Sequence, residues 1–342
     1  MKNIQLGITS FAEVMRDPVT KTKVTYEKRI NQVLEEIVHA EKVGLDYFGI
    51  GEHHREDFAV SSPQIILAAA APLTETIRLG SAVTVLSSDD PVRIYQQFST
   101  INAIAKGRVE ITAGRGSFIE SFPLFGYDLK DYDELFEEKL DLLVKIRDHE
   151  IVSHQGKHRP SFERIGIYPR TDHPLTISVA VGGTVESVKR AARYGLPLFL
   201  AIIGGEPIRF KPLVDLYRRE FVSHGHDIRD AFVSVHSHGY IDLDHEKAIE
   251  TFFPSIELAM SRIGAERGWG PYTRATYEHA LSMDGALYVG SPDYVAQKIN
   301  RIVSALDLDR FTLHMPIGPM DHELVMRSIG YFGTHVKPLI KP

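Results

Sequence analysis

A short apolar run, Phe48-Gly49-Ile50-Gly51, ends abruptly in three titratable side chains, Glu52, His53 and His54. This pattern is typical of a catalytic strand end, because side chains just past a buried strand can face a cleft. Successive side chains point to opposite faces, so His53 and His54 are poor partners on one metal ion. One imidazole facing a pocket would act as a base or hydrogen-bond donor. The alternative is that Glu52 and the rim of the fold satisfy both histidines.

A second motif, Val181-Gly182-Gly183-Thr184, lies between a predicted strand and a predicted helix. Glycines let the backbone approach an anion closely, and the free amides at a helix start favour a phosphate group. Thr184 and Ser187 would add hydroxyl groups to such a site. The alternative is an ordinary tight turn with a threonine cap.

A third motif, Gly114-Arg115-Gly116-Ser117, places a permanently charged guanidinium between flexible residues. Arg115 would bind an anion there, or it would pair with an acid on the rim of the fold. The motif is not a nucleotide fingerprint, since neither the dinucleotide nor the P-loop spacing of glycines occurs in the chain.

Three further histidines lie in predicted strands. His236 and His238 are two residues apart and therefore share a face, and His314 belongs to the last predicted strand. They would bind a metal, line a pocket or pack in the core. A metal-dependent barrel hydrolase using them with His53 would need carboxylates at matching strand ends, and Glu52 is the only clear one. We therefore predict no metal site.

The elements that must position these residues are eight apolar segments, most of them alternating with helical patterns. The predicted strands are 4–10, 45–51, 77–86, 108–113, 175–181, 197–203, 232–240 and 310–316. Eight such units predict an α/β fold with a closed (β/α)8 TIM barrel, whose active site lies at the carboxyl ends of the strands. We expect a single domain over residues 1–342. Insertions are expected near 150–172, as a loop or small hairpin, and near 268–290, as an irregular segment.

The composition excludes several classes of protein. The net charge is −6 and no dense run of Lys or Arg occurs, which argues against nucleic-acid and anionic-membrane partners. The chain has no cysteine, so disulfides and thiolate metal sites are absent. It has no signal-peptide pattern and no long apolar span, and a cytoplasmic location is expected.

The ordered set of motifs resembles the bacterial luciferase-like monooxygenases. The resemblance rests on Gly51-Glu52-His53-His54, on 78–86 followed by Asp90-Pro91-Val92-Arg93, on Lys106-Gly107-Arg108 ahead of Gly114-Arg115-Gly116, and on Gly290-Ser291-Pro292. It covers almost the whole chain. It implies a TIM barrel that binds FMN at the carboxyl ends of the strands and activates O2 on the reduced flavin.

The resemblance also implies roles for single residues. His53 matches the family's active-site histidine, and Glu52 matches the acid before it. Ala82 and Val83 fall where the family often has a non-prolyl cis peptide bond beneath the flavin ring. The family's flavin phosphate site falls on Arg115, Gly183, Thr184 and Ser187, and Gly114, Val181 and Gly182 complete the cofactor-binding set. Phe11, Ile202 and Ile203 would provide apolar walls that exclude water.

The expected reaction partners are O2 and a small organic substrate. No nicotinamide-binding motif is evident, so a separate flavin reductase is expected to supply reduced FMN, or NAD(P)H binds only transiently. A homodimer is expected by resemblance. Two rival interpretations are an F420-dependent hydride-transfer oxidoreductase on the same fold and a flavin-binding protein without turnover. The acidic tail of F420 would favour more basic residues at the pocket mouth than Arg115 and scattered arginines.

Overall fold

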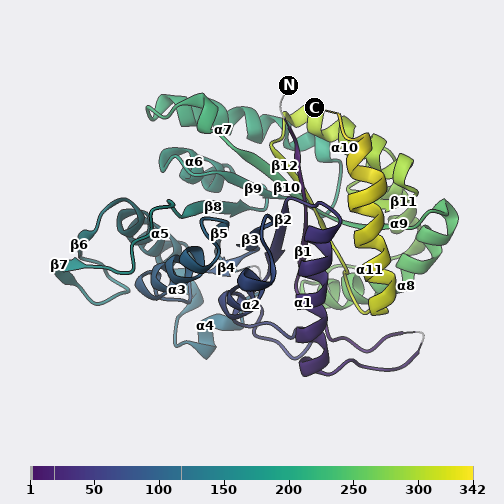
Figure 1. Ribbon diagram of the computed structural model, residues 1–342, viewed down its shortest axis with the longest axis horizontal. Helices are drawn as coiled ribbons and strands as arrows, with labels where there is room; N and C mark the ends of the chain where they lie inside the picture. Colours follow the sequence, from purple (N-terminus) through teal and green to yellow (C-terminus); the bar gives the residue numbers. More distant parts are fainter. Residues whose placement is uncertain (1–2, 19, 117, 342) are drawn as a thin grey trace.

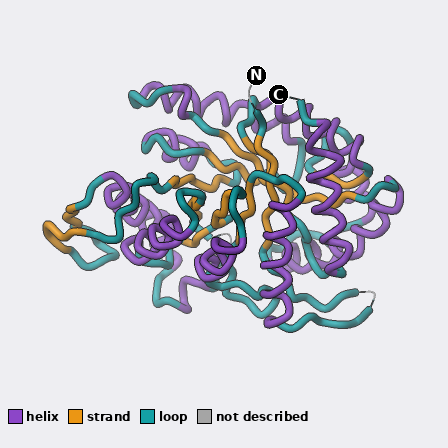
Figure 2. The backbone as a smooth tube through the Cα atoms, viewed as in Figure 1, coloured by secondary structure: helices purple, strands orange, loops and turns teal. Residues whose placement is uncertain are grey.

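The strands of the chain close into a parallel barrel (Figures 1 and 2). The computed structural model describes residues 3–18, 20–116 and 118–341, so Ser117 of the third motif lies outside the described part. The eight positions of the ring are taken by β1 (Gln5–Ser10), β2 (Tyr47–Ile50), β3 (Arg78–Ser81) with β4 (Thr84–Val85), β5 (Val109–Gly114), β8 (Thr176–Val181), β9 (Leu198–Ala201), β10 (Val233–Ile241) and β12 (Arg310–His314). Because β12 pairs with both β10 and β1, the ring is closed. The predicted (β/α)8 TIM barrel is confirmed.

Helices connect the strands and cover the outside of the barrel (Figure 2). They are α1 (Tyr26–Lys42), α2 (Pro63–Ala70), α3 (Pro91–Ile104), α4 (Ser121–Leu124), α5 (Tyr132–Asp148), α6 (Val185–Arg193), α7 (Lys211–Ser223), α8 (His245–Glu266), α9 (Arg274–Leu281), α10 (Pro292–Leu306) and α11 (His322–Tyr331). Shorter helical turns are η1 (Ala71–Leu73), η2 (Leu129–Asp131), η3 (Pro207–Phe210), η4 (Ile228–Asp230), η5 (Phe332–Val336) and η6 (Lys337–Leu339). α1 illustrates the local cause: Val33, Ile37 and Ala40 recur at helical spacing and are all buried.

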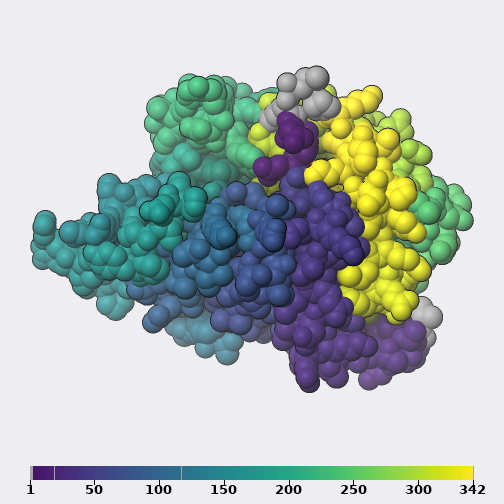
Figure 3. Space-filling view, in the orientation of Figure 1, coloured from purple at the N-terminus to yellow at the C-terminus, as the bar shows by residue number. Residues whose placement is uncertain are grey.

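The two ends of the chain lie side by side (Figure 3). β1 pairs in parallel with β12, and α1 packs beside α11, where His39 Nε2 donates a hydrogen bond to the Met326 carbonyl at 3.0 Å. In Figure 3 these segments are the purple and yellow surfaces in contact. The first and last βα units therefore complete the barrel together.

The third predicted strand, 77–86, is interrupted. β3 ends at Ser81, β4 begins at Thr84, and the peptide bond between Ala82 and Val83 is cis. β3 pairs with β2 and β5, whereas β4 pairs with the end of β5. Ala82 and Val83 thus lie at the carboxyl end of the barrel, and the cis bond that the family resemblance implies is present.

Two excursions leave the barrel pattern, and only one has the predicted form. Residues 151–170 contain an antiparallel hairpin of β6 (Ile151–His154) and β7 (Phe162–Gly166), which projects on the left of Figure 1. Residues 268–290 were expected to be irregular, and this is wrong. They include α9 and β11 (Leu287–Gly290), a strand parallel to the second half of β10. Gly268 and Gly270 precede α9 and Gly285 precedes β11, and both elements are short, so neither stands out in the sequence.

Large side chains fill the amino-terminal half of the barrel interior. Tyr47 is fully buried there, and Gly49 and Gly80 leave room for it, since a Cβ on either would collide with its ring. The guanidinium of Arg310 lies 4.2 Å from the centre of the Tyr47 ring. It donates hydrogen bonds of 2.8 and 2.9 Å to the two carboxylate oxygens of buried Glu110. Because the amino-terminal half of the barrel is filled, a pocket can form only at its carboxyl end.

Candidate active site

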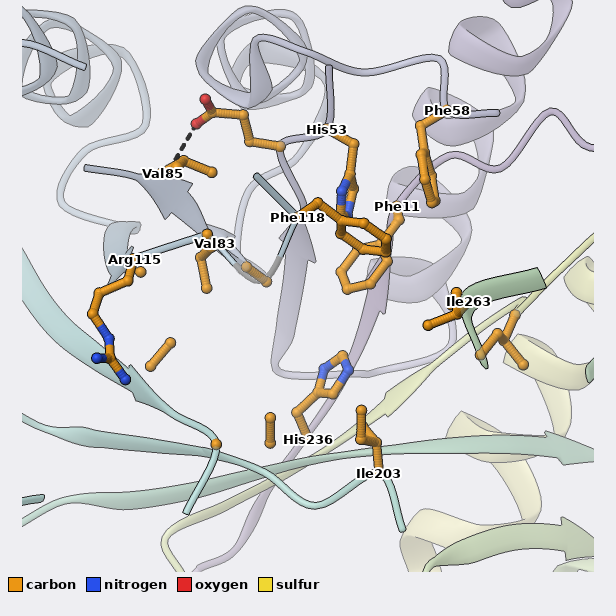
Figure 4. A pocket seen from close by; sticks show the side chains of 18 of the residues that line it. Phe11, His53, Phe58, Val83, Val85, Arg115, Phe118, Ile203, His236 and Ile263 are labelled. Atoms are coloured by element: carbon orange, nitrogen blue, oxygen red, sulfur yellow. Dashed lines mark hydrogen bonds between the residues drawn. The ribbon is translucent and has the colours of Figure 1, made fainter. Parts of the chain in front are cut away.

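A cavity of about 420 Å³ lies at the carboxyl end of the barrel, where the strand ends converge (Figure 4). Its volume falls in the range of cofactor and small-molecule sites. The walls are mostly apolar or aromatic, with a few titratable groups among them. The lining includes Phe11, Glu13, Glu52, His53, His54, Phe58, Ala82, Val83, Gly114, Arg115, Phe118, Val181, Gly182, Phe199, Ile203, His236, His238 and Ile263.

His53 belongs to an aromatic group on one side of the cavity. Its ring stacks on Phe58 with centroids 4.2 Å apart, and it meets Phe11 and Phe118 edge-on at 4.6 and 5.0 Å. Burial, with a smaller contribution from His314, lowers the pKa of His53 to about 3, so the ring is neutral at physiological pH. Its Nδ1 has no hydrogen-bond partner among the described residues. Such an imidazole can donate to a ligand or accept from it.

Glu52 uses both carboxylate oxygens inside the protein. Oε1 accepts a hydrogen bond from His54 Nε2 at 2.9 Å, and Oε2 accepts one from the backbone N–H of Val85 at 2.8 Å (Figure 4). The carboxylate therefore ties the end of β2 to β4. It also holds His54, so the two adjacent histidines have different surroundings, as expected for side chains on opposite faces.

Val83 points into the cavity from the interrupted third strand (Figure 4). Gly114 lies beneath it: a Cβ at this position would lie 2.5 Å from Val83 Cγ2. Gly114 therefore fits closely against Val83, and Ala82 completes the apolar surface on this side. An apolar surface of this kind suits an aromatic ligand ring.

Arg115 lies at the edge of the cavity, on the left of Figure 4. Its Nη1 donates a hydrogen bond to Asp133 Oδ1 at 2.7 Å, and the guanidinium is 5.3 Å from the centre of the Tyr132 ring. The rim acid that the sequence left open as an alternative is thus present. The Asp133 side chain is 71% exposed, so this ion pair contributes little. An anion that entered the cavity would compete for the guanidinium.

The Val181-Gly182-Gly183-Thr184 motif forms the turn between β8 and α6. Gly183 has a φ of +120°, which residues with side chains rarely adopt, and a Cβ on Gly182 would meet no atom within 4 Å. Thr184 occupies the N-cap position without capping the helix, because its hydroxyl donates to Ser187 Oγ at 2.8 Å. The turn is therefore not the ordinary threonine cap of the alternative. An uncapped helix start with open space beside it can bind an anion.

A sequence model of the family described as luciferase-like monooxygenase matches residues 4–308. The chain belongs to this family. Membership makes the protein an oxidoreductase, and it agrees with a pocket at the carboxyl ends of the strands of a TIM barrel.

Two curated proteins match this chain over most of their length. The Sinorhizobium fredii protein y4vJ is 25% identical over 327 residues, which are 91% of this chain and 92% of that protein. The alkanal monooxygenase alpha chain of Aliivibrio fischeri is 21% identical over 323 residues, 88% of this chain and 90% of that one.

Two solved structures share the fold. One is the oxygenating constituent of 3,6-diketocamphane monooxygenase from the CAM plasmid of Pseudomonas putida, in complex with FMN, with a TM-score of 0.77, 18% identity and 99% of both chains covered. The other is an F420-dependent secondary alcohol dehydrogenase in complex with an F420-acetone adduct, with a TM-score of 0.75, 18% identity and 100% of both chains covered. At these identities the likeness is one of fold.

The histidines of β10 and β12 take two of the roles that the sequence left open: lining a pocket and packing in the core. His236 and His238 line the cavity, whereas His314 is fully buried beside them, with its ring 5.4 Å from each of the other two. Within the described residues, the ligand atoms of these histidines and His53 form no group close enough to hold one ion. The close group that does occur there is a surface set of Asp131, Glu134 and His158.

Sequence reasoning missed two acids that line the cavity, Glu13 and Glu120, and misplaced one wall residue. Glu13 lines the cavity and follows β1 much as Glu52 follows β2, so the same strand-end signal could have found it. Phe11 and Ile203 line the cavity as predicted, but Ile202 does not. Ile202 is fully buried in the barrel core, because its side chain points away from Ile203. No helix in the described ranges is long and apolar enough to cross a membrane.

Proposed function

We propose that this chain is an FMN-dependent monooxygenase, which uses O2 to oxidise a small and largely apolar organic molecule. The observation that carries the proposal is the division of the cavity. A buried, neutral His53 lies among aromatic walls, and Arg115 and Gly182, which is in the turn before the uncapped start of α6, line another part of the cavity. A ligand with an aromatic ring and a phosphate matches both parts.

The residues present fit FMN. The first amides of α6, together with Gly182, Gly183, Thr184 and Ser187, would hold the phosphate, and Arg115 would turn from Asp133 to pair with it. The open space beside Gly182 supports this assignment. Ala82, Val83, Gly114 and Val181 would face the ring. When bound in its reduced form, FMN supplies the electrons that activate O2.

The protein's own groups have separate tasks in this proposal. His53 forms a hydrogen bond with the substrate or flavin and moves a proton there as a neutral base or donor. Phe11, Phe58 and Phe118 surround His53 and exclude water from the reacting atoms. Glu52 acts as a positioning residue, because both of its oxygens are engaged by His54 and Val85.

F420 is the alternative cofactor, since neighbours of the same fold bind FMN in one case and F420 in the other. The charges around the cavity suit FMN better. Two arginines lie beside the Phe118 ring: Arg267, which lines the cavity, and Arg55, whose charge is matched by Asp57 and Glu266. The polyanionic tail of F420 would need more cations than these. The separate reductase, the homodimer, the single-domain organisation and the cytoplasmic location remain predictions from the sequence.

Parallel titration of the purified protein with FMN, riboflavin and F420, followed by oxygen uptake, tests the proposal. We expect FMN to bind more tightly than riboflavin, and pre-reduced FMN to support oxygen uptake and product formation with an apolar substrate panel. We expect NADH alone to support little turnover. Tight F420 binding without oxygen uptake would move the protein to hydride transfer. Binding of no flavin would refute the assignment of the site.

A further inference from the structure

A continuous line of buried polar groups runs beside the cavity from Glu13 to His236. Glu13 Oε1 lies 2.9 Å from His314 Nε2, and His314 Nδ1 lies 3.3 Å from Thr9 Oγ1. Thr9 Oγ1 in turn lies 3.0 Å from His236 Nδ1. All four residues are buried, and they come from the neighbouring strands β1, β10 and β12 and the segment after β1. Both ends, Glu13 and His236, line the cavity, and Figure 4 shows His236 pointing into it.

The protonation states of these groups follow from their burial. Burial raises the pKa of Glu13 to about 8, although the nearby Arg29 charge opposes the shift. Burial also lowers the pKa of His314 and of His236 to about 3. At neutral pH the line therefore holds one carboxylic acid, one hydroxyl and two neutral imidazoles.

These states set the direction of every hydrogen bond. Glu13 Oε2 has no partner among the described residues, so the acid proton is better placed on Oε1, where it is donated to His314 Nε2. A neutral imidazole carries one proton, so His314 donates from Nδ1 to Thr9, and the Thr9 hydroxyl donates to His236 Nδ1. The proton of His236 must then lie on Nε2, the ring nitrogen that Thr9 does not contact.

We propose that Glu13, His314, Thr9 and His236 form a proton relay that delivers a proton from Glu13 to a molecule in the cavity. The His236 Nε2–H bond breaks as that molecule takes the proton, and His236 Nδ1 accepts the proton of Thr9. Thr9 Oγ1 accepts the Nδ1 proton of His314, and His314 Nε2 accepts the proton of Glu13. Glu13 is left as a carboxylate, and the net change is the transfer of one proton.

The charges around Glu13 make the product state accessible. Arg29 stabilises the carboxylate, whereas Glu36 and Asp57 oppose it, and His314 faces it directly. Arg29 is itself paired with Glu36 at 2.7 Å, which moderates its effect. Two other histidines face His236: His314 and His238, with ring centres 5.4 and 6.0 Å away. Glu13 lines the cavity, so its carboxylate can take up a new proton from there after each transfer.

The use of the relay rests on the proposed function. In that reaction the substrate, O2, the reduced flavin anion and one proton give the oxygenated substrate, water and oxidised flavin. The flavin anion lacks one of the two hydrogens that leave in the water molecule, so the protein must supply a proton. The relay brings it to the side of the cavity opposite His53 in Figure 4.

Nitrogen-15 NMR of the histidine rings in the cofactor-free protein tests the relay itself. When Glu13 ionises, its carboxylate requires a proton on His314 Nε2, and this in turn moves the proton of His236 to Nδ1. We expect both rings to change tautomer together, with one apparent pKa near that of Glu13. The Thr9→Val variant should leave the change at His314 and abolish it at His236, whereas Thr9→Ser should retain both. Glu13→Gln should abolish both.

A matched control is Thr312→Val, because Thr312 is a buried hydroxyl of β12 that donates to the Val235 carbonyl, outside the relay. It should leave the coupled change intact. If His236 changes tautomer in Thr9→Val as it does in the unaltered chain, or if the two rings titrate independently in the unaltered chain, the relay is wrong. Should Thr9→Val fail to fold, Thr9→Ser and Glu13→Gln decide the question with the same readout.

Turnover separates the relay from the proposed function. With reduced FMN, Thr9→Val should lower the oxygenation rate by about 10²-fold while leaving FMN affinity unchanged, and Thr9→Ser should restore most of the rate. Coupled histidine tautomers in a protein that oxidises nothing would support the relay and refute the monooxygenase assignment. Oxygenation at the normal rate in Thr9→Val would refute the role of the relay in catalysis.

Discussion

The assignment of Arg115 to the flavin phosphate leads to a prediction whose size can be worked out. A hydrogen bond between a guanidinium and an anion contributes about 1.5–3 kcal/mol. Breaking the existing contact with Asp133 costs less than about 1 kcal/mol, because that carboxylate is largely exposed. The net gain on binding FMN is then about 1–2 kcal/mol, so Arg115→Met should raise the Kd for FMN by about 5- to 30-fold. The amides of α6 remain, so binding should weaken without being lost.

Fluorescence titration with FMN and with riboflavin measures this effect. Riboflavin lacks the phosphate, so Arg115→Met should leave its Kd unchanged. Asp133→Asn should have the opposite effect on FMN, tightening it by up to about fivefold, because the competitor for the guanidinium is removed. If Arg115→Met weakens riboflavin as much as FMN, or weakens neither, then Arg115 does not bind the phosphate and the reasoning is refuted.

Three further predictions concern the packing and charge of the site and the barrel. Gly114→Ala should lower the unfolding free energy by about 1–3 kcal/mol, as judged by urea denaturation, because its methyl group overlaps a valine, whereas Gly182→Ala, which meets open space, should not change it. Glu110→Gln should destabilise the fold by about 3 kcal/mol at pH 7. Burial raises the pKa of Glu110, but the Arg310 charge outweighs this effect and lowers the pKa to about 2. The stability that the ionised Glu110 contributes is therefore fully present above the pKa of an unfolded glutamate and is lost as the pH falls toward 2. The denaturation curves of the unaltered protein and of Glu110→Gln should converge in acid. His53→Gln should reduce turnover by about 10²-fold or more with FMN affinity retained, and, since the pKa of His53 is about 3, the two pH–rate profiles should have the same shape near neutrality. If the pH–rate profile of the unaltered protein falls on the acid side near pH 6 and His53→Gln removes that fall, then His53 is not a neutral imidazole at physiological pH.

The sequence allowed the barrel to be predicted because each unit repeats the same local pattern. Apolar runs such as 197–203 alternate with helical spacing such as that of 26–43, and the strand ends carry the titratable residues. The elements that escaped prediction lack such signals. β11 has four residues and follows Gly285, so neither length nor periodicity marks it as a strand.

A site residue could be predicted from the sequence only where its place relative to a strand end was enough to put it at the cavity. Gly182 follows β8 directly and His53 lies three residues after the end of β2, and both line the cavity. The contact of Arg115 with Asp133 depends on α5, whose orientation relative to the barrel is a matter of tertiary packing. The line from Glu13 to His236 joins residues more than 200 positions apart, and the register of β1, β10 and β12 brings them together.

A crystal structure of the protein with FMN would test the assignment of the cofactor site. We expect the flavin ring against Ala82 and Val83, and the phosphate on the first amides of α6, with the Arg115 guanidinium turned from Asp133 toward it. His53 and His236 should face the ring region of the cavity. An FMN molecule bound in the reverse orientation, or bound outside this cavity, would show that the site is wrongly assigned.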